Sequence, residues 1–243
     1  MTRIAVISDI HGNAVALDTA LTDIERAGVD QIVCLGDAIQ GGAQPAQTVA
    51  RLRELGCPVV MGNADAWLLS GVETGTETIT AEQEAVRQWS LAQVSEADRA
   101  YIAAFAPTVI IPLTPDRDLL CFHGSPTSFD DILLPNSPEE EYERLLVPYA
   151  PAIMCGGHTH WQQVHRLGAT FFFNPGSVGL AYNHNQPEEH FKLDPWAEYA
   201  ILSETDGTLV LEFRRVPVSV DAVREALRAS GRPNAEASLA QYE

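Results

Sequence analysis

Three short apolar runs alternate with two amphipathic segments over the first 61 residues, and this alternation constrains the fold more than any other feature of the chain. Residues 3–8, 31–35 and 58–61 are rich in apolar side chains and predict buried strands. Residues 13–26 and 45–55 carry apolar side chains at helical spacing, and a glycine follows soon after each. This order predicts a parallel sheet, with the loops that follow its strands gathered along one edge.

The same periodicity and turn signals predict the rest of the chain. Helical residues are expected at 64–104 with a break at 71–80, and strands and helices further on at 109–113, 119–122, 139–146, 152–155, 162–167, 169–173, 199–203, 209–216 and 218–229. The strands divide into an early parallel group and a later, largely antiparallel group. We predict one domain over 1–230 and a loose tail at 231–243. The segment 124–150 is a candidate loop and helix cap over the site. The tail after Gly231 could also form a cap, and either segment could instead form an oligomer contact.

The charge of the chain limits its partners. The chain has 15 Lys and Arg against 33 Asp and Glu, a formal net charge of −18. An acidic surface repels a phosphate backbone, so extended nucleic acid is not an expected partner, and no basic patch supports a DNA-repair nuclease. A small phosphate ester stays compatible, because a locally cationic pocket can lie within an acidic surface.

The sequence also predicts a cytoplasmic location. No run approaches the roughly 18 apolar residues of a membrane span. Asp9 and His11 come too early for the apolar part of a signal peptide. The four cysteines include no Cys-x-x-Cys pair and are expected to be reduced thiols, mostly buried. We therefore expect no membrane partner, and the oligomeric state stays open.

Polar side chains follow five of the apolar runs, at the point where each predicted strand ends. They are Asp9, His11, Asp37, Asn63, His123, His158 and His160. One such residue is commonly a helix cap or a surface histidine, but repetition at five strand ends indicates a shared site. Oxygen and imidazole ligands without thiolate suit a pair of divalent ions such as Mn, Fe, Zn, Ni or Co. The positive charge of two such ions exceeds the negative charge of two carboxylates, so the pocket would be cationic.

The order of these motifs resembles that of the calcineurin-like metallophosphoesterase superfamily, most closely its small bacterial and archaeal YfcE-type phosphodiesterase branch. The matching motifs are Asp9-x-His11, Gly36-Asp37, Gly62-Asn63, His123-Gly124, Gly157-His158-Thr159-His160 and Asn174-Pro175-Gly176-Ser177. The resemblance implies an α/β (α+β) fold, a four-layer αββα sandwich in which two packed mixed sheets are flanked by helices.

The resemblance also implies a metal-dependent phosphoric ester hydrolase with a dinuclear centre. It assigns the ligands as follows: Asp9, His11 and His160 to one ion, Asn63, His123 and His158 to the second, and Asp37 to both. A hydroxide that bridges the ions, with manganese the favoured metal, would attack phosphorus. Catalytic roles then fall on Asp37, Asn63 and His123, and Asn63 would also bind substrate.

The chain departs from the family pattern in two places. Ala64 stands where many of these phosphatases have a histidine that protonates the leaving group, so this acid is absent or supplied elsewhere. Asp65, which would orient that histidine, is left with either a catalytic role or a helix-capping role. The loop after the Asn-Pro-Gly-Ser motif lacks the arginine found in related enzymes, and Asn183 and His184 are candidate substrate contacts there.

Three functions are compatible with these features. The favoured one is a phosphodiesterase acting on small or nucleotide-like diesters. A phosphomonoesterase of the protein-phosphatase or dinucleotide-polyphosphatase type is the alternative, weakened by the missing histidine and the scarcity of arginine near the motifs. A non-catalytic metal-containing scaffold is the third, weakened by the presence of the full ligand set.

Overall fold

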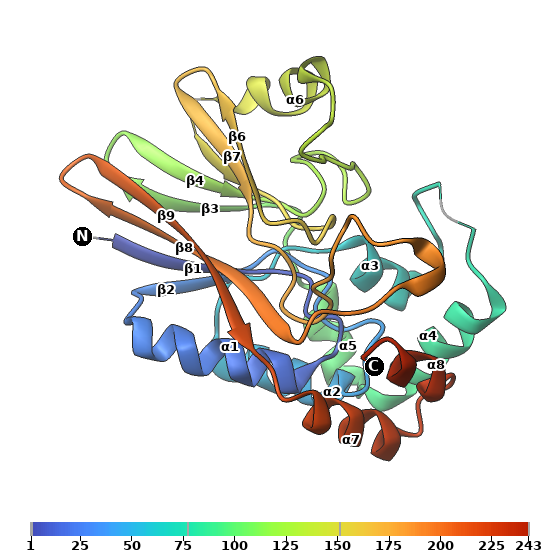
Figure 1. The fold of residues 1–243 in the computed structure, drawn as a ribbon. Helices are drawn as coiled ribbons and strands as arrows, with labels where there is room; N and C mark the ends of the chain where they lie inside the picture. Colours follow the sequence, from blue (N-terminus) through green and yellow to red (C-terminus); the bar gives the residue numbers. More distant parts are fainter. Residues whose placement is uncertain (1, 77, 151, 243) are drawn as a thin grey trace.

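Two β-sheets packed face to face form the centre of the molecule, and helices cover their outer faces (Figure 1). The computed structural model describes residues 2–76, 78–150 and 152–242. Both sheets contain parallel and antiparallel pairs. The predicted sandwich of two mixed sheets between helices is therefore confirmed.

The first sheet has four strands in the order β2-β1-β8-β9. Their bounds are β1 Thr2–Ile7, β2 Gln31–Cys34, β8 Trp196–Thr205 and β9 Thr208–Pro217. The second sheet has five strands in the order β3-β4-β5-β7-β6. Their bounds are β3 Val109–Thr114, β4 Arg117–Cys121, β5 Ile153–Cys155, β6 Gln163–Leu167 and β7 Thr170–Asn174.

The helices follow the predicted order closely in the amino-terminal half. They are α1 Ala14–Ala27, α2 Pro45–Leu55, α3 Asn63–Ser70, α4 Ala81–Gln93 and α5 Glu96–Ala103. Further along lie α6 Glu139–Leu146, α7 Val220–Ser230 and α8 Ala235–Ala240, with short 3-10 turns at Val147–Tyr149 and Glu188–His190. Within the described residues no helix combines the length and apolarity that crossing a bilayer requires.

The assignment of strands to sheets differs from the prediction. Strands β1 and β2 pair in parallel as expected, but the last hairpin, β8 and β9, joins the same sheet through antiparallel pairing of β8 with β1. The centre of the second sheet is parallel, from β4 through β5 to β7. The division into an early parallel and a later antiparallel group was therefore wrong. Periodicity indicates that a segment is a strand but not which distant strand it joins.

The predicted third strand at 58–61 is reduced to isolated bridges. Val59 pairs with Cys34, and Val60 pairs with Ala106, both in parallel. Pro58 has no N–H to donate, and Gly62 precedes the first residue of α3. The segment still runs parallel to β2, so Asn63 lies at the edge of the sheet where β2 ends.

Three apolar clusters hold the layers together. Between the sheets lie side chains such as Val6, Val33 and Leu119. On the outer face of the first sheet, α1 and α2 contribute Leu17 and Leu52 among others. Helix α6 packs on the outer face of the second sheet through Tyr142, Leu145 and Leu146, against Phe122, Met154 and Phe172. The helical part of segment 124–150 therefore covers the outer face of the second sheet and not the predicted site.

The carboxyl-terminal segment is ordered, and the prediction of a loose tail was wrong. Helix α8 packs on α7 through Leu239, Val223 and Leu227, and the two helices lie together in red in Figure 1. The backbone N–H of Leu193 donates to the carbonyl of Gln241 at 2.8 Å. These tertiary contacts stabilise a helix of six residues, which is too short to persist alone.

Candidate metal centre

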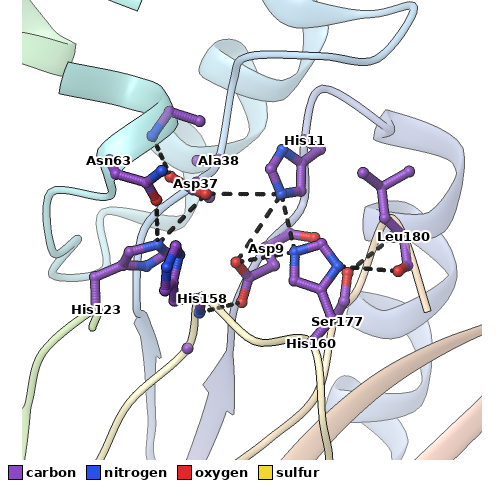
Figure 2. A network of polar contacts seen from close by, with 12 residues as sticks. Asp9, His11, Asp37, Ala38, Asn63, His123, His158, His160, Ser177 and Leu180 are labelled. Atoms are coloured by element: carbon purple, nitrogen blue, oxygen red, sulfur yellow. Dashed lines mark hydrogen bonds and ion pairs between the residues drawn. The ribbon is translucent and has the colours of Figure 1, made fainter. Parts of the chain in front are cut away.

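All seven predicted ligands lie together at the carboxyl ends of strands from both sheets (Figure 2). They are placed by the loops after β1 (Asp9, His11), β2 (Asp37), β4 (His123) and β5 (His158, His160) and by the start of α3 (Asn63). The edges of two stacked sheets meet here, so loops more than a hundred residues apart become neighbours.

Six of these side chains form two groups that could each hold a metal ion. Asp9, His11 and His160 form the first, and Asp37, His123 and His158 form the second. In each group the ligand atoms lie within 4.8 Å of one another. Asn63 joins the second group, because its Oδ1 lies 3.0 Å from Nε2 of His123.

Asp37 lies between the two groups. Its Oδ2 is 3.7 Å from Nε2 of His11 and 3.4 Å from Nε2 of His123. Its Oδ1 accepts a hydrogen bond of 2.8 Å from the backbone N–H of Ala64. One carboxylate thus faces both groups, which is the arrangement that a ligand shared by two cations requires.

Backbone carbonyls orient three of the imidazole rings. The pairs are His11 Nδ1 with Gln40 O at 2.9 Å, His123 Nδ1 with Leu35 O at 2.8 Å and His160 Nδ1 with Leu180 O at 3.1 Å. A carbonyl oxygen only accepts, so Nδ1 carries a proton in each ring. In the neutral ring Nε2 is then the lone-pair nitrogen, and it points toward the other ligands.

The donor atoms fit a divalent cation. Nε2 of His11 and Nε2 of His160 lie 3.1 Å apart, so with both rings neutral two lone pairs face each other unless a proton or a cation bridges them. Oδ1 of Asp9 is buried, has no hydrogen-bond partner among the described residues and lies 3.3 Å from Nε2 of His160. Imidazole nitrogen with carboxylate oxygen suits a borderline transition metal.

Without an ion, the buried carboxylate and imidazole stabilise each other's charge. Burial lowers the pKa of His123, but the charge of Asp37, a hydrogen bond to it and the charge of Asp9 together outweigh burial and raise this pKa to about 9. Burial alone would raise the pKa of Asp37, but the charges of His123, His11 and His158 and a hydrogen bond with His123 together hold this pKa far below its usual value. Because ligands must be deprotonated to bind metal, ion binding at this pair releases a proton.

The backbone of the site is strained. Asp9, His11, Asp37, His158 and His160 all have positive φ angles, between 48° and 68°. Only Asp206 and Asn234 share this property among the other described non-glycine residues. The left-handed region is costly for residues with a Cβ, so its concentration at five candidate ligands indicates that ligand placement, rather than backbone preference, shapes these loops.

The Asn-Pro-Gly-Ser motif holds two ligand loops together. Oγ of Ser177 donates to the carbonyl of Asp9 at 2.8 Å. Nδ2 of Asn174 donates to the carbonyl of Gly157 at 2.6 Å. The motif therefore positions the loops that carry Asp9 and His158.

Asp65 lies behind the ligands, fully buried. Its two oxygens accept 3.0 Å hydrogen bonds from the backbone N–H groups of Ala38 and Ile39, directly after Asp37. Burial raises the pKa of this carboxyl group to about 7, and the charge of Asp37 acts in the same direction. Helix α3 has no side-chain cap, so the capping alternative was wrong. Asp65 is placed to position the Asp37 loop, and a catalytic role stays a prediction.

His184 and Asn183 lie on the other side of His160. Nε2 of His184 donates to the carbonyl of His160 at 3.1 Å, and its ring stacks on Trp161 with 4.1 Å between centroids. With Tyr182 they line a second cavity of about 350 Å³, which shares His160 with the cavity at the metal ligands. Neither residue is among the described residues that line the cavity at the metal ligands, so their role in substrate binding stays a prediction.

A cavity of about 510 Å³ opens onto the candidate ligands. His11, Asp37, Asn63, His158 and His160 form one wall. The opposite walls come from α4 and from the carboxyl-terminal segment: Glu82, Gln83, Val86, Arg232, Asn234, Ala237, Ser238 and Gln241. No described residue of 124–150 lines it, so the predicted cap is not formed there. Of the two segments that the sequence offered as caps, the carboxyl-terminal one lines the cavity, although no motif marks its individual residues.

Replacing Gly62 with alanine is expected to disrupt the site. A Cβ at this position would overlap Oδ1 and the backbone nitrogen of Asp37, so the loop must move. We expect a loss of about 1–3 kcal/mol in unfolding free energy together with weaker metal binding. Calorimetry and metal analysis measure the two effects. Gly168→Ala is the control: its Cβ meets open space but its φ is +59°, so it should cost about 1 kcal/mol and retain metal. Equal metal retention by both variants would contradict the prediction.

The stacked sheets and the paired groups of candidate metal ligands at their strand ends have the architecture of a metallophosphoesterase domain. The sequence profile described as the calcineurin-like phosphoesterase superfamily domain matches residues 2–193. The chain belongs to this superfamily, which confirms the resemblance seen in its motifs.

Several solved structures share the fold. A hypothetical protein from Pyrococcus horikoshii, PH1004, is 18% identical, with a TM-score of 0.83 over 100% of this chain and 98% of the other. A metallophosphoesterase from Sphaerobacter thermophilus is 24% identical, with a TM-score of 0.73 over 98% and 96%. The Escherichia coli phosphoesterase YfcE is 22% identical, with a TM-score of 0.50 over 90% and 100%.

A local sequence match adds one curated relative. The uncharacterized protein MJ0912 of Methanocaldococcus jannaschii is 48% identical over 68 residues. This stretch covers 28% of this chain and 28% of that protein.

Proposed function

We propose that this protein is a phosphodiesterase that hydrolyses small or nucleotide-like phosphodiesters with two divalent ions, manganese being the favoured metal. The observation that carries the proposal is the position of Asp37, whose Oδ2 faces His11 of one ligand group and His123 of the other. Both groups border one cavity, so an ester in that cavity would contact both.

In this proposal the residues of the site have separate roles in binding the cations and the ester. Asp9, His11 and His160 would hold one cation, and Asn63, His123 and His158 the other. When bound, the cations would lower the pKa of a water molecule and offset negative charge on the phosphoryl oxygens. Because Oδ1 of Asn63 faces His123, its amide nitrogen would be the atom that donates to a phosphoryl oxygen.

The residue after Asn63 limits the leaving groups that the proposed site could release. Ala64 contributes its backbone N–H to Asp37, and its methyl group cannot protonate a leaving group. Esters with good leaving groups, which need no such proton, are therefore the proposed substrates. The net charge of −18 supports a small ester over extended nucleic acid.

Hydrolysis of two chromogenic esters tests the proposal. The protein is stripped with a chelator, reloaded with Mn²⁺ and assayed on bis(p-nitrophenyl) phosphate and p-nitrophenyl phosphate. We expect kcat/KM for the diester to exceed that for the monoester by about tenfold or more, equivalent to about 1.4 kcal/mol in transition-state stabilisation. The stripped protein should hydrolyse neither.

Two results would contradict it. A dominant monoester activity would identify a phosphomonoesterase. No activity on either ester, with metal analysis confirming bound Mn²⁺, would favour a non-catalytic scaffold. Zn²⁺ and Ni²⁺ loading under the same conditions tests the preference for manganese.

A further inference from the structure

The carboxyl-terminal segment brings an arginine to the metal-ligand cavity. Arg232 follows α7, lies outside the residues matched by the superfamily profile and lines the cavity together with Ser238 and Gln241. This segment is far in sequence from the amino-terminal ligand loops. In Figure 1 it is drawn in red and lies beside α4, with which it lines the cavity. No motif of the sequence points to this residue.

The guanidinium of Arg232 is only partly satisfied. Its Nε donates to the carbonyl of Gly41 at 2.7 Å, and its Nη1 donates to the carbonyl of Pro233 and to Oγ of Ser238. Across 2–76, 78–150 and 152–242, Nη2 has no acceptor and no carboxylate lies within 4.0 Å of the group. Two charged donors therefore remain for a ligand.

Arg232 combines partial burial with the lack of an acidic partner among the described residues. Arg26, Arg99, Arg117, Arg166 and Arg228 also form no ion pair there, but they are exposed to solvent. Seven other arginines, Arg3, Arg51, Arg53, Arg87, Arg144, Arg214 and Arg215, form ion pairs with Asp or Glu in the described part of the protein. Burial lowers the pKa of Arg232, yet a guanidinium keeps its charge at any physiological pH. A half-buried cation without a counter-charge is costly, and an anionic ligand would offset that cost.

The position of Arg232 is tied to the metal centre. Gly41, which accepts from Nε, is adjacent to Gln40, whose carbonyl accepts from Nδ1 of His11. The same short loop therefore orients a metal ligand and the guanidinium. A donor held in this way loses less conformational freedom when it binds an anion.

Arg232 also borders a second cavity. A smaller, largely apolar space of about 200 Å³ lies under α7 and α8. It shares His11, Leu180 and Arg232 with the metal-ligand cavity. Arg232 therefore stands at the boundary between the candidate ligands and an apolar recess.

We propose that Arg232 is a substrate-binding residue whose Nη2 donates to a negatively charged oxygen of the phosphate group at the metal centre. The inference rests on the proposed phosphoesterase function and names a residue that recognises its phosphate. Arginine suits this role because its planar donor fork matches phosphate oxygens.

Binding of inorganic phosphate to the Mn²⁺-loaded protein tests the proposal by titration calorimetry. Arg232→Gln should raise the Kd for phosphate by about 10- to 100-fold, the usual effect of losing a hydrogen bond between charged groups. Arg232→Lys should fall between Arg232→Gln and wild type, because it keeps the charge. Arg228→Gln, an exposed position on α7, is the matched control and should bind like wild type. Metal content should not change in any variant.

A second measurement on the wild-type protein covers the case in which Arg232→Gln does not fold. Phenylglyoxal modifies accessible arginines, and peptide mass spectrometry reports the rate at each position. Saturating phosphate should slow modification of Arg232 and leave that of Arg228 unchanged. Unchanged phosphate affinity in folded Arg232→Gln, or an unchanged modification rate at Arg232, would overturn the proposal.

The proposed function and this inference fail in distinguishable ways. Wild-type protein that binds phosphate through Arg232 but hydrolyses no ester would contradict the phosphodiesterase proposal alone. An active enzyme whose KM for bis(p-nitrophenyl) phosphate is the same in wild type and Arg232→Gln would overturn the role of Arg232 alone.

Discussion

Replacing Asp37 with alanine is expected to lower kcat/KM for bis(p-nitrophenyl) phosphate by about 10³-fold or more. Oδ2 of this residue faces both ligand groups, so its removal takes one ligand from each of two candidate ion sites. It also leaves the N–H of Ala64 without its 2.8 Å acceptor. Steady-state kinetics and metal analysis of the same preparation measure the loss of activity and of bound metal together.

A carboxylate far from the site provides the control for this variant. Asp116 is exposed in the turn between β3 and β4, and Asp116→Ala should retain both metal and activity. Asp37→Asn keeps the shape but removes the charge, so we expect most of the loss to persist. Full activity in Asp37→Ala would mean that the bridging position has no part in turnover. If the wild-type protein has no turnover and Asp37→Ala still binds a protein partner, the protein is a scaffold.

Replacing Asp65 with alanine is expected to destabilise the protein by about 2–4 kcal/mol, because two buried N–H groups lose their acceptor. Those N–H groups belong to Ala38 and Ile39, so the loop that presents Asp37 loses its support. For a chain of this size the melting temperature should fall by about 5–15 °C. Differential scanning calorimetry of the metal-free protein measures this directly, without a contribution from bound ions.

The role of Asp65 is decided by comparing stability with turnover. An exposed carboxylate such as Asp118 gives the control, and Asp118→Ala should melt within about 1–2 °C of wild type. Asp65→Asn keeps one acceptor and should lie between wild type and Asp65→Ala in both stability and metal affinity. If Asp65→Asn melts like wild type and binds metal normally but has lost turnover, Asp65 is catalytic and the positioning role is wrong.

Much of the candidate site could be read from the sequence because it depends on local features. Asp9, Asp37 and His123 each lie two or three positions after a strand, and a strand end is visible in the sequence. Parallel strands present these ends at a common edge, so residues far apart in sequence could be placed together without knowledge of the pairing. Helix α2 and helix α6 lie at the predicted residues for the same reason, since their apolar spacing and flanking turns are local signals.

The sequence could not reveal features that depend on long-range contacts. Asp65 looked catalytic or helix-capping, and only the folded chain brings its carboxylate to the N–H groups of Ala38 and Ile39. His184 comes soon after the Asn-Pro-Gly-Ser motif in the sequence. In the structure its ring stacks on Trp161 and bonds to the carbonyl of His160. In both cases the local sequence leaves the direction of the side chain open, and packing decides it.

The sequence by itself determined the candidate ligand set and its placement at the strand ends, because the alternation of apolar runs and polar turns is encoded residue by residue. The tertiary structure alone decided which sheet receives β8 and β9 and which segment walls the cavity. It brought Arg232 within 2.7 Å of Gly41, a contact across 191 positions of the chain. The physical reason is that such contacts arise from burial of α7 and α8 against the rest of the fold, and no local periodicity specifies where a helix docks.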